Sequence, residues 1–142
     1  MDKNKIFLIA ASISLLSGCV YLNPQKAQSY RQQITETTPV CHSQRQCDAA
    51  WSSARNWILD HCGMKIQNIT NDYIETYTPE EDYPGHFPIG CRVTKDPDPD
   101  GSYSLHIRTS LPVRGYDEEF LYKKALDFNQ TVRETLNRFP DH

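Results

Sequence analysis

Residues 47–63 have the sequence CDAAWSSARNWILDHCG and decide the fold, because an amphipathic pattern is enclosed here between two cysteines. The apolar residues recur at helical spacing, at Ala50, Trp51, Ala54, Trp57 and Ile58. A stop signal follows at residues 61–63, where a glycine can take the left-handed conformation that ends many helices. We therefore expect a helix over residues 48–60 whose aromatic face, with both tryptophans, packs in the core.

Four β-rich stretches follow this helix, at residues 64–69, 73–78, 89–95 and 103–109. Residues 70–72 form a turn-forming cluster that predicts a hairpin between the first two stretches. In the last stretch apolar and polar residues alternate, which is typical of a strand buried on one face. A second amphipathic helix follows Asp117, with an apolar stripe at Leu121, Ala125, Phe128, Val132 and Leu136.

These elements predict an α+β fold with an antiparallel four-stranded sheet, in the order α-β-β-β-β-α. Each helix has one apolar side to bury, so we expect the N-terminal and the C-terminal helix on one face of the sheet. The other face can stay in contact with water. Residues 41–142 would form this single small domain.

The N-terminus has the features of an export signal. A short basic region precedes an apolar run over residues 6–16, which is shorter than the roughly 20 residues of a membrane-spanning helix. The next residues, Leu16-Ser17-Gly18-Cys19, resemble the lipobox of bacterial lipoproteins. This resemblance implies cleavage of residues 1–18 and a diacylglycerol on Cys19 that anchors the mature chain to a membrane. In that class an Asp after the cysteine favours the inner membrane, so Val20 implies the outer membrane, with the domain facing the periplasm.

The other cysteines, Cys41, Cys47, Cys62 and Cys91, are even in number, which favours two disulfides in an oxidising compartment. A helix between Cys47 and Cys62 separates them by about 22 Å, whereas a disulfide needs α-carbons within about 7 Å. Cys41 could reach Cys62 only through a fully extended segment. We therefore expect Cys41–Cys47 and Cys62–Cys91, with free redox-active thiols as the alternative.

Residues 19–40 contain few apolar side chains and predict a lipidated N-terminus followed by a flexible tether. A coil of about 20 residues has an end-to-end distance on the order of 25 Å. The alternative is a short helix over residues 26–34.

Motifs for catalysis or cofactor binding are weak. Residues 96–101, DPDPDG, match the opening of a calcium loop, but Ile107 stands where a bidentate Glu is required. We interpret the segment as an acidic, proline-stiffened turn and expect neither metal nor cofactor. The histidines are scattered without a zinc-ligand spacing, at His42, His61, His86, His106 and His142.

The most plausible contact surface is the polar loop between the second and third predicted strands. It offers aromatic and acidic side chains for a partner, namely Glu80, Glu81, Tyr83, His86 and Phe87. In the alternative, Tyr83 and Phe87 fold back onto the core.

The favoured function is a non-catalytic binding or scaffold role in the envelope, with a periplasmic or outer-membrane protein as partner. The net charge of −3, which becomes −4 when Lys3, Lys5 and Asp2 leave with residues 1–18, argues against nucleic acid. The alternatives are a cell-wall-acting enzyme that uses the loop carboxylates and an inhibitor of lysozyme-like enzymes.

Overall fold

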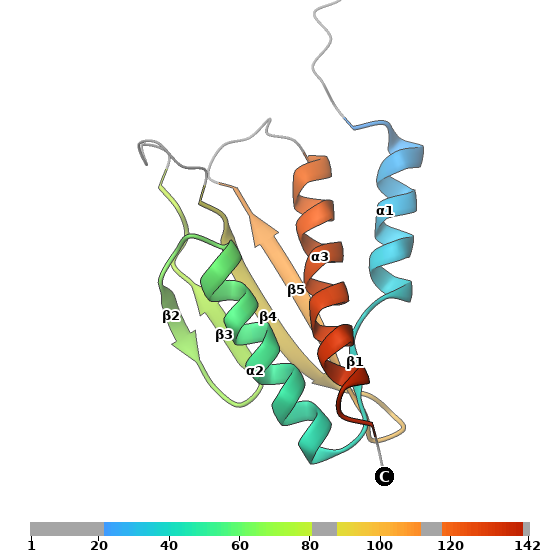
Figure 1. The fold of residues 1–142 in the computed structure, drawn as a ribbon. Helices are drawn as coiled ribbons and strands as arrows, with labels where there is room; N and C mark the ends of the chain where they lie inside the picture. The colour runs from blue at the N-terminus through green and yellow to red at the C-terminus, as the bar shows by residue number, and fades with distance from the viewer. Residues whose placement is uncertain (1–21, 81–87, 112–117, 141–142) are drawn as a thin grey trace, which may run out of the picture.

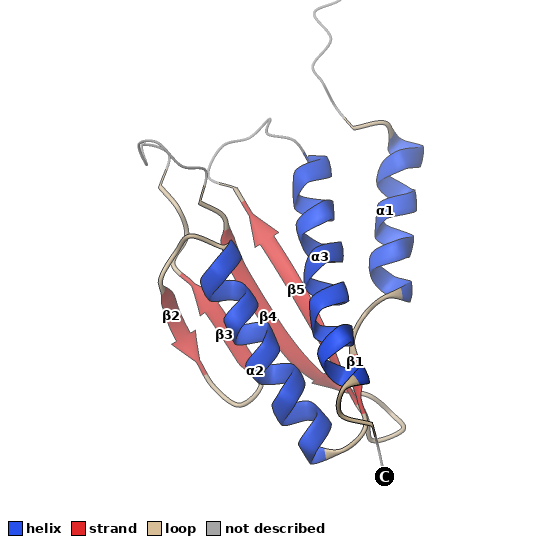
Figure 2. Cartoon of the chain, viewed as in Figure 1, coloured by secondary structure: helices blue, strands red, loops and turns tan. Residues whose placement is uncertain are grey.

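The computed structural model describes residues 22–80, 88–111 and 118–140. The elements, in chain order, are α1 (Pro24–Glu36), β1 (Val40–Cys41), α2 (Gln44–His61), β2 (Ile66–Ile69), β3 (Tyr73–Thr76), β4 (Gly90–Pro97), β5 (Tyr103–Ser110) and α3 (Glu118–Asn137). The strands form one antiparallel sheet in the order β1-β5-β4-β3-β2. Helices α2 and α3 cover one face of this sheet, and α1 lies alongside α3 (Figures 1 and 2).

The α+β class and the antiparallel sheet are confirmed, but the prediction of four strands and two helices is wrong. The described residues contain a fifth strand and a third helix. Strand β1 pairs with β5 through Val40 and Ser104 and through Cys41 and Tyr103. Two residues are too short to display an alternating pattern, so β1 has no signal in the sequence.

Helix α1 occupies a large part of the segment predicted as a flexible tether, so that prediction is wrong over Pro24–Glu36 and the helical alternative is correct. The helix begins at Asn23, whose side-chain oxygen accepts a hydrogen bond of 2.9 Å from the backbone N–H of Gln25. Pro24 at the first helical position suits this start, because its fixed φ is already helical.

The expected central helix is confirmed as α2. Ser43 caps its start by accepting from the backbone N–H of Gln46, and Gly63 follows its end with a φ of +73°. Trp57 is buried at the centre of the core, where its ring meets the edge of Phe128 with centroids 5.4 Å apart. Trp51 is only half-buried, and its indole N–H donates to the carbonyl of Thr70.

Both expected disulfides are confirmed. Cys41–Cys47 joins β1 to the first turn of α2, with α-carbons 5.1 Å apart. Cys62–Cys91 joins the end of α2 to the start of β4, with α-carbons 6.1 Å apart. All four cysteines are buried in the apolar core. The helix at the centre of the fold is therefore held to the sheet at each end by a covalent bond.

Candidate functional site

The face of the sheet opposite the helices is polar. Strand β4 places Arg92 on this face beside Glu75 of β3 and Arg108 of β5, and the register pairs these three residues across the sheet. A second row is formed in the same way by Tyr73, Thr94 and His106. Two arginines directly opposite each other repel, so this arrangement costs stability unless a carboxylate compensates it.

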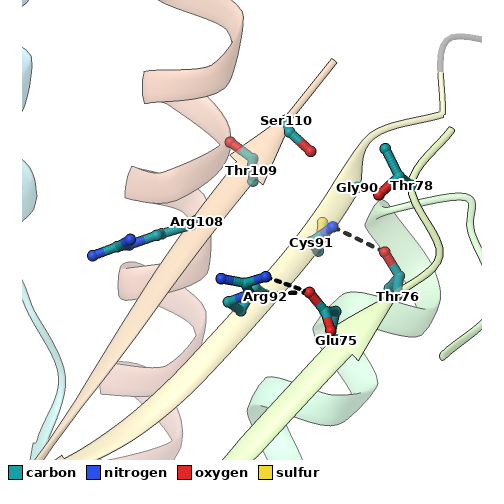
Figure 3. Close-up of a pocket in the computed structure, with 9 residues that line it drawn as sticks. All are labelled: Glu75, Thr76, Thr78, Gly90, Cys91, Arg92, Arg108, Thr109 and Ser110. Carbon is teal, nitrogen blue, oxygen red and sulfur yellow. Dashed lines mark hydrogen bonds and ion pairs between the residues drawn. The ribbon is translucent and has the colours of Figure 1, made fainter. Parts of the chain in front are cut away.

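A cavity of about 250 Å³ lies at one end of this open face, and we call it the open-face pocket (Figure 3). Its lining comes from β3, β4, β5 and the residue Thr78, and consists of Glu75, Thr76, Thr78, Gly90, Cys91, Arg92, Arg108, Thr109 and Ser110. Gly90 allows the close approach of neighbouring chains, because a Cβ there would lie 2.7 Å from the Ser110 hydroxyl and 3.2 Å from the Pro79 ring.

The carboxylate that neutralises Arg92 is Glu75. The Nε and Nη2 atoms of Arg92 both donate to Glu75 Oε1 (Figure 3). Hydrogen bonds from Arg92, and then from Tyr73, hold the pKa of Glu75 below its ordinary value. The guanidinium of Arg92 also lies 5.7 Å from the centre of the Tyr73 ring. Glu75 is therefore a carboxylate at neutral pH that neutralises Arg92, which does not suit it to donate a proton.

Arg108 has a different environment. Its side chain points away from the Glu75–Arg92 pair in Figure 3, and no described residue forms a hydrogen bond or ion pair with it. Thr76, in contrast, accepts from the backbone N–H of Cys91 at 2.9 Å and donates to the carbonyl of Tyr77. The lining of the open-face pocket thus includes an arginine without a partner among the described residues and the hydroxyl-bearing residues Thr78, Thr109 and Ser110, groups that can hydrogen-bond a polar or anionic group.

The predicted contact residues lie mostly outside the described part of the chain, as does the lipidation residue. This applies to Cys19, Glu81, Tyr83, His86 and Phe87. Glu80 is described and exposed. It follows Pro79, whose ring borders Gly90 of the open-face pocket, so the segment predicted as a contact loop begins beside this pocket.

Sequence reasoning missed Glu75, Arg92 and Arg108 as a group. The alternation in residues 103–109 indicated that Arg108 would lie on the polar face of its strand. The pairing of Arg92 with both neighbours depends on the register of three strands, and a pattern within one strand does not determine this register.

The aspartates of the calcium-like segment accept hydrogen bonds from neighbouring Ser and Thr hydroxyls, beginning with Thr94 to Asp96. Asp98 Oδ2 accepts from the hydroxyls of Ser104 at 2.7 Å and Ser102 at 3.2 Å. Asp100 accepts from the hydroxyl and the backbone N–H of Ser102, which lowers the pKa of Asp100. Within the described residues, no three His, Cys, Asp or Glu side chains gather as metal ligands would. These contacts are those of a structural turn.

One histidine lies in a polar cluster between α2 and α3. Asp127 Oδ2 accepts from the buried indole of Trp57 at 2.7 Å and lies 3.8 Å from His61 Nε2. The His61 ring stacks on Trp57 with centroids 4.6 Å apart, and its Nδ1 lies 2.9 Å from the Trp57 carbonyl oxygen. Asp127 thus satisfies the polar atom of a buried ring, which is a structural role.

Comparisons with protein-family models, with curated proteins and with solved structures find no match to this chain. In the part of the chain that the structure describes, no helix is long and apolar enough to span a membrane.

Proposed function

We propose that this chain is a lipid-anchored lipoprotein of the bacterial cell envelope whose domain binds or positions a periplasmic or outer-membrane protein without catalysis. In this proposal residues 1–18 are removed, Cys19 carries the lipid, and the domain faces the periplasm. The lipid takes the place of a transmembrane helix, since two or more acyl chains anchor a protein stably.

The observation that carries the proposal is the partition of the cysteines. The chain contains five, and the four in the described domain form two disulfides. The fifth is Cys19, which ends the lipobox-like sequence. Disulfides form and persist in exported proteins, so the paired cysteines and the export signal support the same compartment.

The described side chains favour binding over catalysis. Glu75 is held by Arg92, Asp127 by the Trp57 indole and Asp98 by two serines, so each of these carboxylates already has a structural partner. Arg108, at the open-face pocket, has no hydrogen bond or ion pair with another described residue and can therefore contact an outside group. An arginine beside hydroxyl groups is well suited to hold a carboxylate of a partner protein.

Mass spectrometry of the protein isolated from membranes tests the lipid anchor. We expect a mature chain that begins at an acylated Cys19, and no acylation in the Cys19→Ala variant. Val20→Asp is the matched control for destination, because it leaves Cys19 intact and is expected to move the protein to the inner membrane. A native chain that retains residues 1–18 or carries no acyl group would refute the proposal.

Site-specific photo-crosslinking tests the binding role. A photoreactive residue at position 106, which is exposed on the same face of β5 as Arg108, should capture one defined envelope protein, whereas the same residue at Gln130, which is exposed on α3, should not. Arg108→Glu should abolish binding of that captured protein. Cell-wall turnover that depends on the chain and is lost in Glu81→Gln would instead support an enzyme and contradict this proposal.

A further inference from the structure

Helix α1 is held against α3 by a polar cluster centred on Glu119. The Glu119 carboxylate accepts from Lys26 Nζ at 2.6 Å and from the Tyr30 hydroxyl at 2.8 Å, both on α1. Lys123 Nζ of α3 lies 3.0 Å from the same carboxylate. Hydrogen bonds from Lys26, Lys123 and Tyr30, in decreasing order, lower the pKa of Glu119 to about 2. The carboxylate thus joins the first half of α1 to the start of α3.

Further contacts extend along α1. The rings of Tyr30 and Tyr122 stack with centroids 5.5 Å apart and an interplanar angle of 10°. Near the end of α1, the side-chain amide of the buried Asn129 donates to the Ile34 carbonyl at 2.9 Å and to the Thr37 hydroxyl at 3.1 Å. Ala27 is buried and lies between Lys26 and Tyr30, the two residues of α1 that bind Glu119. Contacts at both ends of α1 fix its direction relative to the domain.

Only residues 20–23 separate Cys19 from the start of α1 at Pro24. A fully extended chain spans at most about 3.5 Å per residue, so Pro24 lies within about 17 Å of Cys19. If α1 were detached from α3, its 13 residues would increase this reach by about 20 Å or more. Docking of α1 therefore shortens the flexible connection between Cys19 and the folded domain.

The start of α1 lies at a defined end of the domain. Figure 1 shows the starts of α1, α3 and β4 at this end, together with the ends of α2, β3 and β5. The turn between β4 and β5, which carries Asp98 and Asp100, lies at the opposite end. The eight residues of β4 correspond to about 26 Å between the two ends.

We propose that docking of α1 on α3 orients the domain on the membrane, so that the end with the starts of α1 and α3 faces the lipid surface. This inference rests on the proposed acylation of Cys19. The acidic β4–β5 turn then points away from the lipid phosphates. The open-face pocket lies where β3 and β5 end and β4 begins, so it belongs to the membrane-proximal end. The partner surface that reaches this pocket is therefore one close to the membrane.

Energy transfer from a dye on the protein to labelled lipid headgroups tests the orientation. The full-length acylated protein is inserted into phosphatidylcholine vesicles with a dye on an unnatural amino acid at position 118 or position 71. Both positions are exposed and they lie at opposite ends, at the start of α3 and in the β2–β3 turn. We expect transfer from position 118 to exceed that from position 71. Equal transfer, or stronger transfer from position 71, would overturn the inference.

A pair of variants on α1 tests whether docking causes this orientation. Ala27→Asp places a charge in the buried contact with α3 and should abolish the difference between the two dyes. Gln28→Asp makes the same charge change at the exposed neighbour and should preserve it. Ala27 is absent from the apolar core cluster, so the domain should remain folded, with both disulfides, as checked by circular dichroism. A difference that persists in Ala27→Asp would overturn the role of docking.

Flotation of the protein with the vesicles separates the two proposals. A protein that does not float lacks a functional anchor, and the lipoprotein proposal fails. A protein that floats, yet shows equal transfer from both positions, retains the anchor and refutes only the orientation.

Discussion

Helix α3 has two neighbouring helices, and its contacts with them differ in chemistry. Towards α2 it buries Phe128 and Val132 against the aromatic face that includes Trp57. Towards α1 it presents Glu119 and Tyr122, which meet charged and hydroxyl groups. The first contact resembles a protein core, whereas the second resembles an interface between separate parts. We therefore expect that α1 can leave α3 without unfolding of the domain.

The largest effect is expected at the apolar contact. Phe128 is fully buried, so Phe128→Ala should lower the free energy of unfolding by about 3–5 kcal/mol through lost burial and a cavity. Denaturant unfolding monitored by circular dichroism measures this change. Phe120→Ala is the matched control on the same helix, because Phe120 is 37% exposed, and its effect should stay within about 0.5 kcal/mol. Similar effects of the two substitutions would contradict the assignment of the core to this side of α3.

The two disulfides are expected to contribute unequally to the stability of the domain. Replacing Cys62 and Cys91 together by Ala opens a loop with a sequence separation of 29 and should cost about 3–4 kcal/mol on the chain-entropy model. Replacing Cys41 and Cys47 together by Ala opens a shorter loop, with a sequence separation of 6, and should lower the free energy of unfolding by about 2 kcal/mol. Denaturation midpoints of the two double variants give the comparison. A larger loss of stability on removal of Cys41–Cys47 would contradict this order. It would indicate that the short bridge, which holds β1, stabilises the native state beyond its effect on loop closure.

A smaller effect is expected where α1 meets α3. Asn129→Ala removes two hydrogen bonds to the end of α1 and should destabilise this contact by about 1 kcal/mol. Amide hydrogen exchange should accelerate in α1 and remain unchanged in α2. The control is Gln130→Ala, an exposed change one residue away that should leave both helices protected. Faster exchange in both helices would show that α1 and the core unfold together.

The smallest effect is expected from acid. Hydrogen bonds from Lys26, Lys123 and Tyr30 lower the pKa of Glu119 to about 2 in the docked state, and because Lys26 and Tyr30 lie on α1, the ionised form of Glu119 favours docking. This contribution is complete above about pH 4.5 and is lost as the pH falls through about 2. Nuclear magnetic resonance shifts of α1 backbone carbons should move towards coil values in this window. Glu119→Gln should remove the pH dependence of these shifts between pH 4.5 and pH 2. If the shifts of that variant still change with pH as in the native protein, the transition belongs to another group.

The sequence by itself determined the parts of the fold whose signals are local. Ala50, Ala54 and Trp57 mark the buried face of α2 within a few turns, and the length of that helix excludes a Cys47–Cys62 bridge. The predicted pairing of all four domain cysteines followed from that length and is correct. Such features are predictable because helix periodicity and covalent reach depend only on residues close together in the chain.

Only the tertiary structure decided the remaining features. Helix α1 is mostly polar. It lies against α3 through hydrogen bonds to residues about 90 positions away in the chain. Strand β1 is defined by its partner on β5, and the open-face pocket by the register that sets Glu75, Arg92 and Arg108 in one row. Each of these features results from side chains distant in sequence, whose partners no local pattern specifies. The physical reason is that a polar segment gains its structure from a specific neighbour, whereas an amphipathic segment carries its own preference for burial.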